Sequence, residues 1–465
     1  MVVILLLVAL VVPVIASAAG FDAAVLSLPQ QTYGPAREPC ESPSGSAVTL
    51  SPTGNWQRAL ESGAPGTRFF LQAGTYQASD ITLAPGITVK PLQCAAVTLR
   101  GRVRPGSNAT LAGVTVDART GTTNVYAGDA TIRLDRTTSG VTIRNSLLTQ
   151  DDHYGIAVTA SHQRLTIQGN ELRVPSQATS NNVLWVNGAC QGCTFSDNKL
   201  VSLGGPADLA QFWYWSGTWT LARNWFGASP TKGNHLDIKL SQPGTSGNVL
   251  EVVNNYFDGR QLNVDGYGCV ITHNASDRGV GSGYSYTVNA TGNYFLGCRG
   301  SVWDHRISTG AGERDPTGRT LRFTYNVIHN PGDVGRLLCE SDNCHVEHNT
   351  FVGAELKVGA GGYVPRAVAV HNNIFYQTRF TNPGNISVCS HNDFYQVSGA
   401  PGCASSITGD PRFVHLASNW QLQPGSPAIG AGIGGATLGA LSNAGPVPVP
   451  VPLPAPYNLR LLDIP

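Results

Sequence analysis

The sequence of 465 residues is short of charge, of lysine and of methionine. Only 13% of its residues are charged, five are lysine, one is methionine, and the net charge is +1. This balance excludes the basic footprint of a nucleic-acid-binding protein and the polybasic patch of a membrane-surface protein. We therefore expect no nucleic-acid partner and, after removal of a signal peptide, no membrane partner.

Sequence motifs that would indicate a specific enzymatic activity are also absent. The chain holds no phosphate-binding loop, no nucleophile elbow and no zinc-protease helix, and no helix pattern follows the glycine-rich stretch 279–283. One long apolar run opens the sequence, and residues 1–19 read as a signal peptide, although the usual positive charge is absent. A membrane anchor is the alternative, for which the run Val2 to Ile15 is short. We expect a secreted or cell-surface monomer.

Ten cysteines in an exported chain favour disulfides over zinc. Cys190 and Cys193 form a single CxxC, which we interpret as a small loop staple rather than a redox or metal site. Proximity in sequence suggests four further pairs: Cys269–Cys298, Cys339–Cys344, Cys389–Cys403 and Cys40–Cys94.

A short apolar alternation followed by asparagine and an apolar pair recurs along the chain, as in "LTIQGNEL", "LEVVNNYF" and "VAVHNNIF". Successive asparagines are 19 to 38 residues apart, a spacing typical of a solenoid. The units are rich in β-branched and aromatic residues and show no helical period, so each is strand-like. The asparagines are Asn145, Asn170, Asn198, Asn224, Asn255, Asn293, Asn326, Asn349, Asn373 and Asn392.

These repeats resemble the right-handed parallel β-helix of the pectate lyase-like superfamily, in which asparagines stack from coil to coil. "NWQRALESGAPGTRFFLQAGTY" resembles the entry cap of β-helical polysaccharide lyases. "DPRFVHLASNWQLQPGSPAIGAG" resembles the closing segment common in exported bacterial β-helix proteins. The expected fold is all-β, a right-handed parallel β-helix with an asparagine ladder and a short N-terminal capping helix. The expected divisions are a signal peptide (1–19), an N-terminal segment and cap (20–66), the β-helix (67–432) and a proline-rich tail (433–465).

The segments "NVLWVN", "LAQFWYW", "NHLDIKL", "GCVITHN" and "SVWDHRIS" should stack as one column, taken to be the strand before each asparagine turn. In "NHLDIKL" the alternation predicts that His235, Asp237 and Lys239 share one exposed face. An exposed face built from these stacked strands suits the binding of an extended polysaccharide, because aromatic rings stack on sugars and cationic side chains pair with acidic groups. We expect Trp213, Trp215, Arg278 and His305 to bind substrate.

In "SVWDHRIS" we expect Asp304 and Arg306 to face outward, because burying both charges would be costly. Asp237 and Asp304 are candidate Ca²⁺ ligands. The plainer reading makes Lys239 the partner of Asp237 in an ordinary ion pair, and makes the histidines structural.

"DIKLSQPGTSGNVLEVVNNYFDGR" resembles the lysine-bearing segment of lyases of the chondroitinase B and alginate lyase type. The resemblance implies β-elimination on a uronate polymer, with Lys239 as base and with Arg260, Arg306, His273 and His235 as further catalytic candidates. The likeness does not identify the family's arginine or its acidic Ca²⁺ ligands.

Two alternatives stay open from the sequence. A glycoside hydrolase on the same scaffold needs converging carboxylates, and only Asp237 with Asp304 qualifies. A carbohydrate-binding or surface protein needs no catalytic group, because the fold alone does not imply catalysis.

Overall fold

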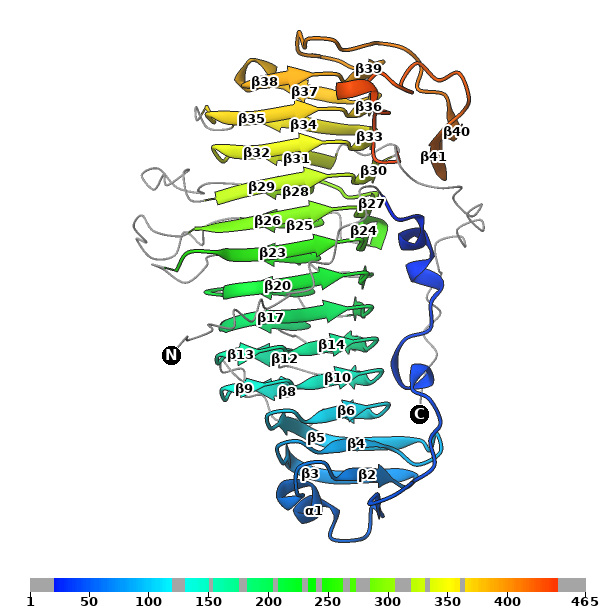
Figure 1. The fold of residues 1–465 in the computed structure, drawn as a ribbon, viewed down its shortest axis with the longest axis vertical. Helices are drawn as coiled ribbons and strands as arrows, with labels where there is room; N and C mark the ends of the chain where they lie inside the picture. The colour runs from blue at the N-terminus through cyan, green and yellow to red at the C-terminus, as the bar shows by residue number, and fades with distance from the viewer. Residues whose placement is uncertain are drawn as a thin grey trace, which may run out of the picture.

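The computed structural model describes residues 21–118, 130–149, 154–174, 182–203, 208–227, 233–239, 245–261, 268–272, 285–305, 319–330, 335–359 and 364–441. Within them the chain winds as a right-handed parallel β-helix, and its coils stack along one long axis (Figure 1). Each complete coil contributes one strand to each of three parallel ladders. The predicted fold class is therefore confirmed.

The first ladder holds the strands that precede the asparagine turns. Its members are β1 (Val48–Leu50), β2 (Arg68–Leu71), β4 (Thr88–Pro91), β6 (Thr110–Ala112), β10 (Thr142–Arg144), β14 (Thr166–Gln168), β17 (Ala189–Ser196), β20 (Ser216–Ala222), β23 (Asn248–Val253), β26 (Tyr286–Thr291), β29 (Arg319–Thr324), β32 (Asn343–Glu347), β35 (Ala367–His371) and β38 (Val388–Ser390).

The second ladder follows the turns. Its members are β7 (Thr115–Asp117), β11 (Leu147–Thr149), β15 (Glu171–Val174), β18 (Lys199–Ser202), β21 (Trp225–Phe226), β24 (Tyr256–Asp258), β27 (Tyr294–Leu296), β30 (Val327–His329), β33 (Thr350–Val352), β36 (Ile374–Tyr376) and β39 (Asp393–Tyr395).

The third ladder completes each coil. Its members are β3 (Gly74–Leu83), β5 (Val97–Pro105), β8 (Ala130–Leu134), β12 (Tyr154–Val158), β16 (Leu184–Val186), β19 (Ala210–Phe212), β22 (Leu236–Ile238), β25 (Val270–Thr272), β28 (Ser301–His305), β31 (Gly335–Cys339), β34 (Ala354–Val358) and β37 (Arg379–Thr381). It joins the second ladder through β5, which pairs with both β7 and β8. The short strands β9 (Thr138–Ser139) and β13 (His162–Gln163) pair in line with the start of β17.

Buried asparagines form an unbroken ladder at the turn between the first and second ladders. From Asn170 to Asn392, each side-chain Nδ2 donates to the Oδ1 of the next asparagine at 2.9–3.1 Å. Asn145 was wrongly assigned to this ladder, because Ser146 occupies its first position and its backbone N–H donates to Asn170 Oδ1. Asn145 lies one residue earlier, in the left-handed conformation with φ 50°.

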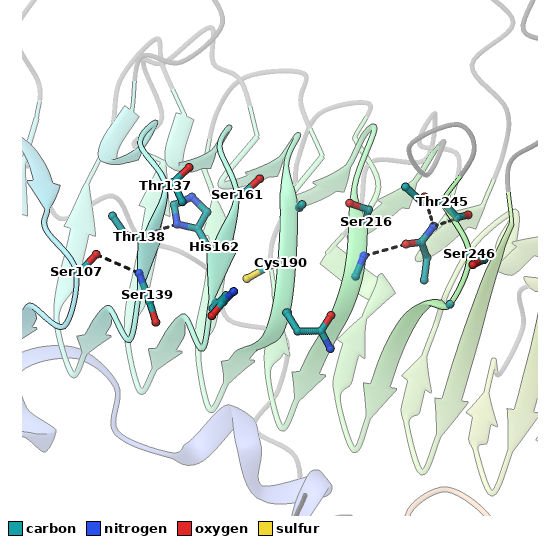
Figure 2. A pocket seen from close by; sticks show the side chains of 16 residues that line it. Ser107, Thr137, Thr138, Ser139, Ser161, His162, Cys190, Ser216, Thr245 and Ser246 are labelled. Atoms are coloured by element: carbon teal, nitrogen blue, oxygen red, sulfur yellow. Dashed lines mark hydrogen bonds between the residues drawn. The ribbon is translucent and has the colours of Figure 1, made fainter. Parts of the chain in front are cut away.

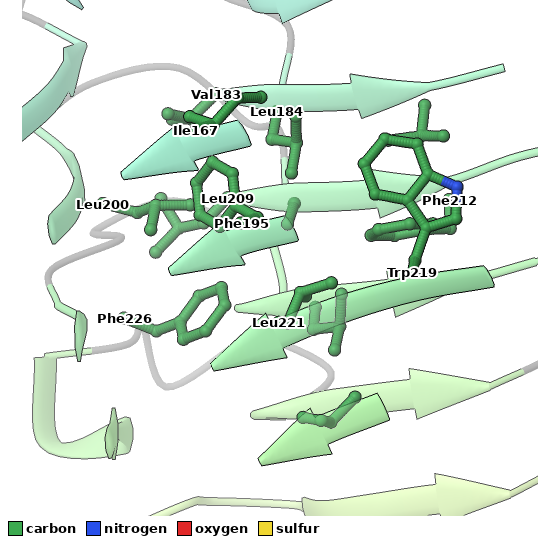
Figure 3. Packing of buried hydrophobic residues seen from close by; sticks show 14 of the residues in the cluster. Ile167, Val183, Leu184, Phe195, Leu200, Leu209, Phe212, Trp219, Leu221 and Phe226 are labelled. Carbon is green, nitrogen blue, oxygen red and sulfur yellow. The ribbon is translucent and has the colours of Figure 1, made fainter. Parts of the chain in front are cut away.

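The interior is filled by apolar side chains that stack from coil to coil. Figure 3 shows Phe195 and Leu221 of the first ladder, Leu200 and Phe226 of the second, and Leu184 and Phe212 of the third meeting inside the coils. Phe226, Phe257 and Phe295 form a continuous stack with ring centroids 4.7 and 4.8 Å apart. Burial of each such ring stabilises the fold by about 1.5–3 kcal/mol.

The start of the β-helix is closed as the sequence predicts. Helix α1 (Trp56–Ser62) covers the first coil, with Trp56 packed edge-on against Tyr76. At the other end β40 (Phe413–His415) and β41 (Asn419–Leu422) form an antiparallel hairpin. The predicted tail is described only as far as residue 441.

An N-terminal strap, residues 21–40, runs beside the second ladder in the direction opposite to the coils (Figure 1). It contains the 3-10 helices η1 (Ala23–Gln30) and η2 (Gly34–Arg37); other short 3-10 turns are η3 (Gly259–Gln261), η4 (Pro383–Asn385) and η5 (Ile433–Gly435). The Phe21 N–H donates to the Ala440 carbonyl at one end of the strap, and the Cys40–Cys94 disulfide holds the other. The strap and the C-terminal segment together bury the outer side of the second ladder.

All five predicted disulfides are present: Cys40–Cys94, Cys190–Cys193, Cys269–Cys298, Cys339–Cys344 and Cys389–Cys403. This set indicates folding in an oxidising compartment. No helix among the described residues is long and apolar enough to span a bilayer, and the proposed signal peptide lies outside those residues.

Candidate functional site

The predicted column of strands is the third ladder. Trp185, Gln211, Asp237, Ile271 and Asp304 are successive register partners on its outer side. One detail of the prediction is wrong, because the strand directly before each asparagine turn belongs to the first ladder, and the third ladder precedes it in the coil.

A polar cluster surrounds Asp237 on this side. Gln211 Nε2 lies 3.1 Å from both Asp208 Oδ2 and Asp237 Oδ2, so one amide bridges two carboxyl groups. Asn234 donates to Asp208 Oδ1 from its backbone N–H at 2.7 Å and from Nδ2 at 2.8 Å. Desolvation, followed by repulsion from Asp237, raises the pKa of Asp208 to about 7. Asp208 therefore keeps its proton to a higher pH than an ordinary aspartate does.

Lys239 completes the cluster. Its Nζ lies 3.4 Å from Asp237 Oδ2 and 4.4 Å from the centroid of the Trp213 ring. The Lys239 side chain is 15% exposed and that of Asp237 is 4% exposed, so the lysine is the more accessible of the pair. The expected ion pair is present, and it is partly desolvated rather than lying on an open surface. Trp213 is half-buried and supports the ammonium group from the neighbouring coil.

The prediction that His235 shares this exposed face is wrong. Its side chain is fully buried, with the imidazole beside Phe226 and Phe257 of the interior stack. Nε2 lies 2.9 Å from the Gly227 carbonyl oxygen. The chain bends just before β22, and this bend turns His235 inward like Leu209 of the preceding coil. An enclosed imidazole of this kind cannot contact a polymer outside the coils.

Burial of His235 predicts a specific dependence of stability on pH. Desolvation lowers its pKa from 6.5 to about 4, so the unfolded chain takes up the proton first as the pH falls. The stabilising contribution of the neutral histidine is complete above about pH 6.5 and is lost towards pH 4. As the pH is lowered through this window, the free energy of unfolding should decrease more steeply in the wild type than in His235→Gln. The difference in slope should be up to about 1.4 kcal/mol per pH unit.

Guanidinium unfolding at several pH values measures both slopes. His415→Gln is the matched control, because His415 is exposed and should leave the slope unchanged. Equal slopes for the wild type and His235→Gln would contradict the assignment of His235 as a buried neutral group.

Three other residues that were expected on the exposed outer face of the third ladder do not lie there. Trp215 is fully buried and packs edge-on against Phe212, so it cannot stack on a sugar. His305 is fully buried, with Nδ1 2.6 Å from Thr272 Oγ1, and desolvation lowers its pKa to about 3. Arg260 forms two hydrogen bonds of 2.8 Å with Asp258 of the second ladder and does not join Lys239.

Asp304 is oriented as predicted, in the outward register beside the inward Trp303, but neighbouring groups bury it completely. Its Oδ2 accepts from Ser301 Oγ at 3.2 Å and lies 3.4 Å from Arg336. His273, Arg278 and Arg306 lie outside the described residues.

The described donor set does not fit a calcium ion. Asp237 and Asp304 are two rungs apart, about 9.6 Å along the ladder, with Ile271 between them. Around Asp208 and Asp237 the neighbouring groups are N–H donors, whereas calcium needs six to eight oxygen ligands. No group of three or more His, Cys, Asp or Glu gathers among the described residues.

Sequence reasoning missed Asp208 and Gln211. Aligning "DLAQF" with "NHLDI" would have placed Asp208 over Asn234 and Gln211 over Asp237, which is the observed register. The signal was therefore available, but Asp208 lies before its strand and outside the alternating pattern.

Comparison with known proteins gives a structural likeness. The chain is similar to the crystal structure of pectate lyase Pel9A, with 14% identity and a TM-score of 0.45 over 87% of this chain and 98% of that one. No family model and no curated protein matches the sequence. The ladders themselves establish a right-handed parallel β-helix protein, and the likeness carries no argument about its activity.

Proposed function

We propose that this protein is a secreted polysaccharide lyase that cleaves a uronic-acid-containing polymer by β-elimination, with Lys239 as the base. The observation that carries this proposal is the position of Lys239 Nζ, partly exposed on the outer side of the third ladder, over Trp213 and beside Asp237. The resemblance of the lysine-bearing segment to alginate lyase-type enzymes supports the same assignment.

The reaction requires a base to take the C5 proton of the uronate, after which a C4–C5 double bond forms and the glycosidic oxygen leaves with a proton. Lys239 would first release its own proton to solvent and would then accept the C5 proton, and Asp237, 3.4 Å away, would stabilise the ammonium group that forms.

His273 and Arg306 are proposed as the acid and the carboxylate-binding cation. Ile238 pairs with Thr272, and Thr272 pairs with His305, on three successive strands of the third ladder. Lys239, His273 and Arg306 are the residues that directly follow these three in the sequence. No step is routed through calcium, because the described donors do not fit it.

A glycoside hydrolase is less well supported. Its two carboxyls must lie about 5–9.5 Å apart to hold a glycosidic bond between them. The Gln211 amide nitrogen lies between Asp208 and Asp237, 3.1 Å from an oxygen of each, which leaves no space for a sugar between the two carboxyl groups. Asp304 is fully buried and cannot serve as the second carboxyl.

Incubation with alginate, pectate, chondroitin, dermatan, hyaluronan and glucuronan, with and without a chelator, tests the proposal. A lyase produces an unsaturated uronate, and we expect its ultraviolet absorbance to rise with one of these polymers and to persist with chelator. New reducing ends without that absorbance would indicate a hydrolase instead. Retained polymer binding without either product would indicate a carbohydrate-binding solenoid.

A further inference from the structure

A groove separate from the Lys239 cluster runs along the corner between the third and first ladders. This corner groove encloses about 570 Å³ and crosses six successive coils, from Ser107 to Asn248. At one rung of about 4.8 Å per coil, its length is about 24 Å. Figure 2 shows Thr138, Ser161, Cys190 and Ser216 in this order on successive coils. A groove of this length suits an extended chain rather than a small metabolite.

Hydroxyl and amide groups dominate the lining. Thr137, Ser161, Gln163, Gln191 and Ser246 are exposed along it. Each of these groups can both donate and accept hydrogen bonds, as sugar hydroxyls do. Polar groups of this kind, presented by rigid strands, fix the orientation of a ligand.

Among the described residues that line the groove, the only acidic or basic side chain is a histidine. His162 is buried, its Nδ1 lies 2.8 Å from Thr138 Oγ1, and desolvation lowers its pKa. Arg164 reaches only the rim, where it donates to Ser139 Oγ at 3.1 Å. A polymer with a carboxylate on every unit would lose hydration here without gaining matching cations. The lining therefore favours uncharged sugars.

The floor of the groove is rigid and closed to a peptide strand. Gly217 packs so closely that a Cβ there would overlap the Cys190 carbonyl oxygen, and Asn248 Oδ1 accepts from the Gly217 N–H at 2.9 Å. The strands beneath are interior members of parallel ladders, so no free sheet edge is available for strand addition. Apolar pockets for peptide side chains are also lacking in the lining.

We infer that the corner groove is a second carbohydrate-binding site, which takes an extended segment of a neutral polysaccharide. It is distinct from the site proposed for uronate cleavage and does not depend on that activity. Its contacts are hydrogen bonds without aromatic stacking, which predicts weak binding whose strength grows with the number of sugar units.

Isothermal titration of the full chain with cellohexaose, xylohexaose, mannohexaose and chitohexaose, beside hexagalacturonate, tests this inference. We expect at least one neutral hexaose to bind, and Gln191→Tyr or Ser161→Tyr, which fill the groove, to weaken binding by about tenfold or more. Gln77→Tyr is the matched control at an exposed strand position outside the lining and should bind as the wild type does. Thermal unfolding verifies that each variant is folded.

Three outcomes would overturn the inference. They are no binding of any neutral hexaose, binding that neither filled variant weakens, and hexagalacturonate binding that the filled variants abolish while neutral sugars do not bind. Loss of lyase activity plays no part in the readout, so failure of the proposed function and failure of this inference are distinguishable.

Discussion

Lys239→Ala is expected to abolish formation of unsaturated uronate while leaving the fold intact. Removal of a general base lowers the rate by about 10²–10⁴-fold. The ion pair that is also lost is largely buried, with the two side chains 15% and 4% exposed, so removing the lysine from beside Asp237 costs on the order of 3 kcal/mol of stability. Initial rates from ultraviolet absorbance, measured on the polymer that the wild type cleaves, give the result.

Two further variants separate catalysis from packing. Lys239→Arg keeps a cation beside Asp237 and over Trp213 but cannot act as a neutral base, so it should be as inactive as the alanine variant. Lys199→Ala is the matched control, because Lys199 lies over the Trp225 ring at 5.0 Å and pairs with Glu171 at 3.3 Å on the second ladder. Activity in Lys239→Arg, or equal losses at both lysines, would contradict the role of Lys239.

Asn255→Ala is expected to cause the largest loss of stability of any single change considered. The side-chain Oδ1 of Asn255 accepts from the backbone N–H and Nδ2 of Asn224, and its Nδ2 donates to the Leu221 carbonyl and Asn293 Oδ1. Alanine would remove the bonds of the buried Asn224 N–H and Leu221 carbonyl, while Asn224 Nδ2 and Asn293 Oδ1 would each keep one other partner. Each buried group left unsatisfied costs about 1–3 kcal/mol. A total loss on the order of 4 kcal/mol or more is expected in guanidinium unfolding.

Matched variants show whether the ladder position is responsible. Asn289→Ala removes an outward asparagine that contacts only Glu251 and should cost less than about 1 kcal/mol. Asn255→Ser should be intermediate, because Ser146 fills the first ladder position in the native protein. Similar losses for Asn255→Ala and Asn289→Ala would show that the buried network contributes little.

Features that repeat along the chain could be predicted from the sequence. The asparagine ladder was identified in all but its first position, since every coil presents the same residue in the same apolar setting. Disulfides between nearby cysteines followed from proximity, and stacking of the third-ladder segments followed from their shared position ahead of the asparagine turns. The error at Asn145 arose because asparagine also suits the left-handed residue just before the ladder.

The surroundings of individual residues could not be predicted in the same way. Period-two alternation assigned His235 and Asp237 to one face, but the bend before β22 turns the histidine inward. Alternation likewise gave the correct register for Asp304 without revealing that Ser301 and Arg336 enclose it. The pairing of Asp208 with Asp237 depends on contact between coils, which a pattern read along one strand does not contain.

The N-terminal strap changes how the solenoid should unfold. Coils that touch only their neighbours can fray independently from either end of an array. Here one segment contacts Ala440 near the last coils, lies beside Trp225 in the middle and is covalently tied to Cys94 in an early coil. Loss of a terminal coil would therefore strip contacts from distant coils as well, so the strap converts a nearest-neighbour array into a single cooperative unit.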